Sequence, residues 1–115
     1  MSEDNILTPS GWIRGRLVHA HGKVVAIEGT PCDPAENELP YLLPGFIDLH
    51  VHGGGGADIM EGRDAFETIT RTHVRFGTTS LLATTMTAPV EEISSVLGQL
   101  GTFCEQRPTG SARVL

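Results

Sequence analysis

Residues 44–53 read Pro-Gly-Phe-Ile-Asp-Leu-His-Val-His-Gly, a short apolar run between two glycines. The run predicts a strand over Phe46–His52, because Pro44-Gly45 introduces it and a glycine run ends it. Side chains alternate along a strand, so one face carries Phe46, Asp48, His50 and His52, and the other carries Ile47, Leu49 and Val51. We expect the aliphatic face to pack under a helix. The polar face would line a cleft or the interior of a barrel.

The two histidines of this strand have a spacing that suits a metal site. Residues i and i+2 of a strand have Cα atoms roughly 6.5–7 Å apart. Both His50 and His52 could therefore reach one metal ion at about 2.0–2.1 Å. They also lie at the C-terminal end of the strand, where active sites form in parallel α/β folds. We predict that His50 and His52 are metal ligands. The alternative is a half-buried pair with ordinary hydrogen bonds.

Other polar residues invite structural interpretations. His19 and His21 have the same spacing but fall in a predicted turn, so we expect both to face solvent. His73 lies on the apolar stripe of a predicted helix, which is typical of a core or boundary residue. Asp48 either orients one of the imidazoles or hydrogen-bonds backbone groups, and we favour the backbone role.

The glycine run Gly53–Gly56 predicts a mobile loop that lets a substrate come close to the metal. Bare backbone amides can also bind phosphate. No Lys-Ser or Lys-Thr pair follows the run, so the P-loop pattern is absent. We therefore favour the mobile loop over a phosphate site.

Two amphipathic helices and two more strands are predicted after the glycine run. The first helix spans Arg63–Phe76, with an apolar stripe of Phe66, Ile69, His73 and Phe76 and with Gly77 as its C-terminal cap. The second spans Val90–Cys104, with a stripe of Val90, Ile93, Leu97, Leu100 and Cys104. Thr78–Met86 and Ala112–Leu115 read as strands. Strand-helix-strand-helix-strand is typical of a parallel sheet with right-handed crossovers.

The region before residue 44 follows a different pattern. Trp12–Glu28 alternates with period two and contains His21-Gly22-Lys23, which predicts a β-hairpin. Gly29–Pro40 contains three prolines and few large apolar residues, so we expect a loop. The sequence thus predicts two parts, a small β region over 1–43 and an α/β region over 44–115.

Composition excludes several classes of protein. The chain has 115 residues, 8 basic and 14 acidic side chains and a formal net charge of −6, which argues against nucleic-acid binding. It has no apolar run near the roughly 20 residues that a membrane helix needs. The acidic N-terminus is unlike a secretory signal, and the two cysteines, Cys32 and Cys104, have no metal or redox spacing. We expect reduced thiols and a cytoplasmic location.

Pro44–Gly53 resembles the first barrel strand of the amidohydrolase superfamily. The continuation through Gly53–Gly56 to Ala57-Asp58 is similar to the family that deacetylates N-acetylglucosamine 6-phosphate. Phe76-Gly77-Thr78-Thr79 and the opening Ile6-Leu7-Thr8-Pro9 point the same way. The resemblance implies an α/β fold: the start of a (β/α)₈ TIM barrel, preceded by part of a small β-sandwich over 1–43.

The resemblance also implies a reaction. A metal-dependent hydrolase would convert N-acetylglucosamine 6-phosphate to glucosamine 6-phosphate and acetate in amino-sugar catabolism. His50 and His52 match the ligands of one or two divalent ions, zinc or iron, and the ions would activate a water molecule. The partner would be this small-molecule substrate, with neither nucleic acid nor membrane involved, and the full-length enzyme would be a homodimer.

Most of the family's machinery would follow residue 115. A His-x-Glu-Gly-Pro segment, the later histidine ligands, the catalytic aspartate and the phosphate-binding residues have no match here. We therefore expect an N-terminal portion of a longer enzyme, with no catalytic residue in this segment and no activity alone. The alternatives are a fragment of another amidohydrolase, such as a deaminase or cyclic-amide hydrolase, and a stand-alone metal-binding module. A barrel fragment would self-associate or behave as a molten globule, whereas a complete module would melt cooperatively.

Overall fold

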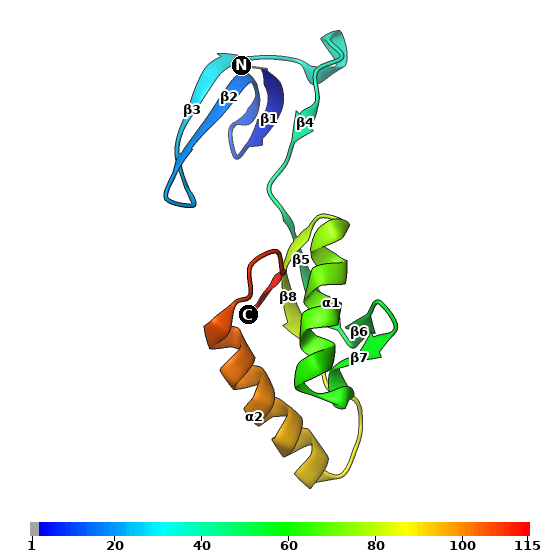
Figure 1. Cartoon of the computed structure of the whole chain (residues 1–115). Helices are drawn as coiled ribbons and strands as arrows, with labels where there is room; N and C mark the ends of the chain where they lie inside the picture. The colour runs from blue at the N-terminus through cyan, green and yellow to red at the C-terminus, as the bar shows by residue number, and fades with distance from the viewer. Residues whose placement is uncertain (1–2) are drawn as a thin grey trace. The chain divides into compact units, whose positions relative to one another are not determined.

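A computed structural model describes residues 3–115, and the chain divides into two compact units (Figure 1). One unit ends at Pro44 and the other spans Gly45–Leu115. The first is a β-sheet with one short 3-10 helix, and the second combines two α-helices with parallel strands. Neither helix of the described residues is long and apolar enough to span a bilayer.

The first unit is a four-stranded sheet in the order β3-β2-β1-β4. Its strands are β1 (Asp4–Thr8), β2 (Gly11–Ala20), β3 (Lys23–Pro31) and β4 (Tyr41–Leu42). The predicted hairpin is confirmed as β2–β3, and its two-residue turn has positive φ at His21 (51°) and Gly22 (72°), as turns that match strand twist require. The loop prediction was wrong at its start, because β3 continues through Gly29 to Pro31 and pairs with Ile13.

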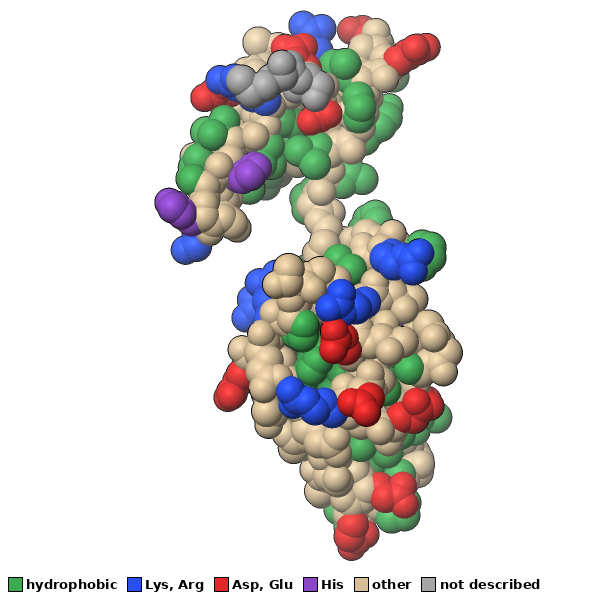
Figure 2. Space-filling model, in the orientation of Figure 1, with side chains coloured by type: hydrophobic (Ala, Val, Ile, Leu, Met, Phe, Trp, Pro, Cys, Tyr) green, Lys and Arg blue, Asp and Glu red, His purple; other side chains and the backbone are tan. Residues whose placement is uncertain are grey.

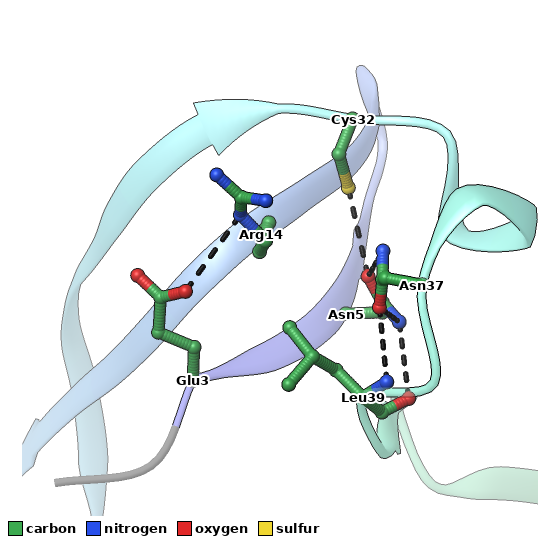
Figure 3. Close-up of polar contacts among 6 residues, drawn as sticks. All are labelled: Glu3, Asn5, Arg14, Cys32, Asn37 and Leu39. Atoms are coloured by element: carbon green, nitrogen blue, oxygen red, sulfur yellow. Dashed lines mark hydrogen bonds and ion pairs between the residues drawn. The ribbon is translucent and has the colours of Figure 1, made fainter.

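Strand β1 was not predicted from the sequence. A buried polar side chain of β1, Asn5, holds the long connection that follows β3. Asn5 is fully buried, and its amide group donates to Asn37 Oδ1 at 2.8 Å and to the Leu39 carbonyl at 3.1 Å (Figure 3). Its own Oδ1 accepts from Asn37 Nδ2 at 3.2 Å and from the Cys32 thiol at 3.7 Å. These bonds satisfy both polar atoms of the side chain and hold the 32–40 segment against β1.

Replacing Asn5 by leucine is expected to destabilise the first unit by about 2 kcal/mol, because the half-buried partners of the amide lose their hydrogen bonds. Arg14→Ala is the matched control, since it breaks only an exposed ion pair to Glu3 at 3.7 Å, which contributes about 0–1 kcal/mol. Urea unfolding followed by fluorescence of the single tryptophan, Trp12, reports on this unit. Equal midpoints for the two variants would contradict the prediction.

The second unit has the predicted alternation of strands and helices. A three-stranded parallel sheet in the order β5-β8-β9 is formed by β5 (Phe46–Val51), β8 (Thr78–Ala83) and β9 (Arg113–Val114). Helices α1 (Arg63–Arg75) and α2 (Val90–Gln106) connect the strands. Between β5 and α1 the chain adds the small strands β6 (Gly53–Gly54) and β7 (Ala57–Asp58) and a 3-10 turn over Ile59–Glu61.

The core of this unit lies between the helices and the sheet, and it corrects the predicted helix stripes. Phe66 and Ile69 are fully buried as expected, and the Phe66 ring meets Phe103 edge to face at 5.6 Å. Phe76 is 79% exposed, because α1 has already ended at Arg75. On α2 the buried residues are Val96, Leu100 and Phe103, and the predicted Val90 and Leu97 are exposed. The face of α2 that carries Phe103 is the one that packs on α1.

The aliphatic face of β5 is only partly covered. Val51 is 3% exposed, as predicted for a side chain under a helix, but Ile47 and Leu49 are 61% and 67% exposed. The reason is the placement of α1, which packs on β8, on the β6–β7 hairpin and on α2, and much less on β5. The expectation of a fully packed aliphatic face was therefore wrong for the first two-thirds of the strand.

Candidate metal centre

His50 and His52 converge at the C-terminal end of β5. His50 is the penultimate residue of the strand, and His52 follows its last residue. Their Nε2 atoms lie 2.9 Å apart, with ring centroids at 4.7 Å and the ring planes 74° apart. The His50 side chain is exposed and that of His52 is half-buried. The structure thus brings together the two side chains that the spacing singled out, with matching nitrogens facing each other.

The separation of these nitrogens can be compared with that of two ligands on one ion. Two imidazoles bound tetrahedrally at 2.0–2.1 Å have ligand nitrogens about 3.3–3.4 Å apart. The observed 2.9 Å is a few tenths of an ångström shorter, a difference that small rotations of the rings about χ2 would remove. The donor set is imidazole nitrogen, which suits zinc and iron. The pair fits the role of two ligands of a divalent metal.

The described residues supply no complete site. Within residues 3–115, no group of three or more His, Cys, Asp or Glu side chains is arranged to hold a metal ion. A catalytic zinc site usually has three protein ligands. The pair alone would therefore supply two ligands, fewer than such a site needs.

Asp48 takes the backbone role that was favoured for it. Its Oδ1 accepts a hydrogen bond from the backbone N–H of His50 at 3.1 Å. The carboxylate therefore stabilises the main chain of β5 next to His50. It has no hydrogen bond to either imidazole among those of the described residues.

The glycine run is a hairpin in place of the predicted loop. Gly53 and Gly54 form β6, which pairs with β7 and lies against α1 (Figure 1). A Cβ on Gly54 would stand 3.0 Å from the His73 ring, so a bare backbone is what lets the helix approach. His73 is half-buried, as expected for a boundary residue, and its Nε2 donates to the Gly53 carbonyl at 3.0 Å. The hairpin fixes the main chain that follows His52.

The turn of this hairpin allows a matched test of packing against α1. Gly55 and Gly56 both have positive φ, at 64° and 83°, so alanine costs about 1–2 kcal/mol of backbone strain at either position. A Cβ on Gly55 would also clash with Thr72 Oγ1, whereas one on Gly56 meets nothing within 4 Å. We expect Gly55→Ala to lower the free energy of unfolding by about 1–3 kcal/mol more than Gly56→Ala. Thermal unfolding followed by helix circular dichroism measures the difference, and equal losses would show that the hairpin does not pack on α1.

The second His-x-His pair behaves as the turn interpretation predicted. His19 lies near the end of β2 and His21 in the turn to β3, and both side chains are exposed on the first unit (Figure 2). No hydrogen bond joins them among the described residues, in contrast to His50 and His52. The same sequence spacing thus gives two unlike arrangements, because only one pair lies at the end of a parallel strand.

A backbone carbonyl group also contacts the His50–His52 pair, and it was not assigned a role from the sequence. The Nδ1 atom of His52 lies 2.9 Å from the backbone carbonyl oxygen of Thr84, the residue after β8. The adjacency of β5 and β8 was the available signal, since the C-terminal ends of neighbouring parallel strands lie side by side. Neither Cys32 nor Cys104 forms a disulfide among the described residues.

Comparison with known proteins supports an enzyme family. Residues 41–106 match the model of the amidohydrolase family, and the chain belongs to that family. N-acetylgalactosamine-6-phosphate deacetylase of Escherichia coli O157:H7 is 34% identical over 108 residues, which are 92% of this chain and 29% of that protein. The chain thus spans less than a third of the length of this relative.

Solved structures give the same grouping. N-acetylglucosamine-6-phosphate deacetylase from Thermotoga maritima superposes with a TM-score of 0.78 at 29% identity, covering 94% of this chain and 28% of that one. A variant of the Mycobacterium smegmatis N-acetyl-D-glucosamine-6-phosphate deacetylase, in complex with N-acetyl-D-glucosamine-6-phosphate, gives a TM-score of 0.73 at 30% identity, covering 90% of this chain and 29% of that one. Both units of the chain lie within these matches, since each covers at least 90% of it.

Proposed function

We propose that this chain is the N-terminal part of a metal-dependent deacetylase acting on an N-acetylated hexosamine 6-phosphate. The observation that carries the proposal is the convergence of the His50 and His52 Nε2 atoms, 2.9 Å apart, at the end of β5 in an amidohydrolase-family chain. The end of a parallel strand is where such folds place their reacting groups. The similarity to the deacetylases supports the substrate class.

The proposed architecture is the start of a (β/α)₈ barrel. Strands β5, β8 and β9 with helices α1 and α2 would be its first βαβαβ segment, over residues 44–115. About 250 residues are needed to close such a barrel. Residues 1–43 would form part of a small β-sandwich. The parallel order β5-β8-β9 and the superposition on the Thermotoga maritima deacetylase support this assignment.

The roles of this chain's residues in the reaction follow from the donor atoms. His50 and His52 would hold one divalent ion, zinc or iron, through Nε2, and a second ion would use ligands outside this chain. When bound, the metal would polarise the amide carbonyl and activate a water molecule for attack on it. His73 and the glycine hairpin would fix the backbone after His52. The groups that transfer protons and bind the phosphate would come from residues beyond 115, so we expect the 115-residue chain alone to be inactive.

The favoured substrate is N-acetylglucosamine 6-phosphate, with glucosamine 6-phosphate and acetate as products. The relative from Escherichia coli O157:H7 is named for the galactosamine epimer. The Mycobacterium smegmatis complex contains the glucosamine compound. Acetate release from the two epimers, measured side by side on the full-length protein, tests this preference. Faster release from the galactosamine compound would reverse the preference and leave the deacetylase class intact.

Metal removal tests the proposed class of enzyme. Dialysis against a strong chelator is expected to abolish deacetylation by the full-length protein, because the activated water is lost with the metal. Added zinc or iron(II) should restore the rate, and magnesium should not, since imidazole ligands suit the former ions. Full activity in the metal-free protein would rule out the mechanism. Hydrolysis of a cyclic amide or release of ammonia from an aminated substrate, without acetate release, would favour the other amidohydrolases.

The proposal extends to the partners and the cellular location of the full-length protein. The expected partner is the small-molecule sugar phosphate, and the full-length enzyme is expected to be a cytoplasmic homodimer. Size-exclusion chromatography with light scattering would give the oligomeric state directly.

A further inference from the structure

The His52 ring is held by the neighbouring strand as well as by its own. Its Nδ1 lies 2.9 Å from the carbonyl oxygen of Thr84. His52 follows the last residue of β5, and Thr84 follows the last residue of β8. Because β5 and β8 pair in parallel, this contact joins the C-terminal ends of two adjacent strands.

The chemistry of the contact decides where the ring proton lies. A carbonyl oxygen accepts hydrogen bonds and cannot donate them, so Nδ1 of His52 carries the proton. A neutral imidazole has one ring proton, which leaves a lone pair on Nε2. That nitrogen is the one that faces His50 at 2.9 Å. We propose that the Thr84 carbonyl is a positioning group, which fixes His52 in the Nδ1–H tautomer and presents its Nε2 lone pair to a metal ion.

The Thr84 carbonyl is itself held in place. The Thr84 N–H donates to the carbonyl of Val51, the last residue of β5, at 2.8 Å, which extends the pairing one residue past the end of β8. The Thr84 hydroxyl donates to the Leu82 carbonyl at 3.2 Å. Val51 is buried, so its end of the ladder is anchored in the core. The positioning group is thus main chain, and the Thr84 side chain contributes only a local bond.

This assignment gives the two histidines different roles. With a lone pair on His52 Nε2, the contact between the rings requires His50 Nε2 to donate its proton. His52 can bind a metal without any change of tautomer. His50 must first move its proton from Nε2 to Nδ1, through solvent, so that its own Nε2 can bind. The proposal rests on the metal role proposed for the pair, and it adds that His52 is preorganised while His50 is not.

Nitrogen NMR on the metal-free protein tests the tautomer directly. The full-length protein is labelled with ¹⁵N-histidine, stripped of metal, and examined by two-bond ¹⁵N–¹H correlation, in which the two tautomers of a neutral imidazole give different patterns. His52 is assigned from the signal missing in His52→Gln. We expect an unprotonated Nε2 and a protonated Nδ1 for His52. The exposed His19 and His21 are internal references and should show the Nε2–H form that solvated imidazole prefers. A proton on His52 Nε2, or the pattern of His19, would overturn the proposal.

Two variants at residue 84 separate the main chain from the side chain. Thr84→Ala keeps the backbone N–H and carbonyl, so the His52 spectrum and the zinc affinity should be unchanged. Thr84→Pro removes the N–H that binds Val51, so the carbonyl loses its anchor. We expect a mixed tautomer for His52 and a zinc affinity about 10–100-fold lower. An unchanged His52 spectrum in a folded Thr84→Pro protein would contradict the proposal. Because the wild-type spectrum needs no metal and no substrate, its outcome is independent of whether the enzyme is a deacetylase.

Discussion

Replacing His50 and His52 together by alanine is expected to remove one bound divalent ion from the full-length protein. The Nε2 atoms of the pair converge to 2.9 Å and no other pair of described side chains offers two imidazoles in this way. Loss of outer hydrogen bonds alone lowers metal affinity by about 10–100-fold. Loss of the ligands themselves should lower the affinity of this ion by about 100-fold or more. Zinc content after dialysis, measured by atomic emission, gives the result.

His19→Ala combined with His21→Ala is the matched control, because that pair has the same spacing and the same chemistry. Both of its side chains are exposed at the β2–β3 turn. The control variant should therefore keep its full metal content. Full metal content in both double variants would show that the converging pair holds no ion, and would remove His50 and His52 from the proposed mechanism.

The order of strands and helices in the second unit could be predicted from the sequence, because its signals are local. A glycine or proline marks the start or end of β5, α1 and α2, and the apolar residues between these marks have a clear period. Which side of each helix is buried depends on the neighbouring elements, so the stripes were less accurate. Phe76 and Leu97 fit the helical period and are exposed, while Phe103 was missed and packs on Phe66.

The glycine run shows why the hairpin after β5 escaped prediction. Four glycines have no side chains and therefore no alternation to indicate a strand. The hairpin packs on α1, and a Cβ on Gly54 or Gly55 would meet the His73 ring or Thr72. These contacts join residues nearly twenty positions apart, and a single sequence does not indicate such pairs.

In the candidate site, too, some groups could be predicted from the sequence and others could not. His50 and His52 could be predicted, because imidazoles are rare, chemically distinctive and placed at a strand end. The Thr84 carbonyl could not, because every residue has a backbone carbonyl and its role depends on the register of β8 against β5. The favoured role of Asp48 is confirmed, since its carboxylate accepts from the backbone N–H of His50.

Two lysines on the exposed face of β5 are expected to suppress self-association of the isolated 115-residue chain. Ile47 and Leu49 are 61% and 67% exposed on an edge strand, where unpaired backbone groups also invite pairing with a second chain. Burying one such aliphatic side chain contributes about 1.5–3 kcal/mol. Removing both from a contact should therefore weaken association by about 100-fold or more. Sedimentation velocity over a range of concentrations measures the change.

The matched control places two lysines at Thr68 and Ser94, which are exposed on α1 and α2. This variant gains the same charge, so any general effect of repulsion appears in it as well. If association falls only in the Ile47→Lys, Leu49→Lys variant, the aliphatic face of β5 is the surface through which the chains associate. If the wild-type chain is monomeric and melts cooperatively, the uncovered face needs no partner, and the stand-alone module regains support over the barrel fragment.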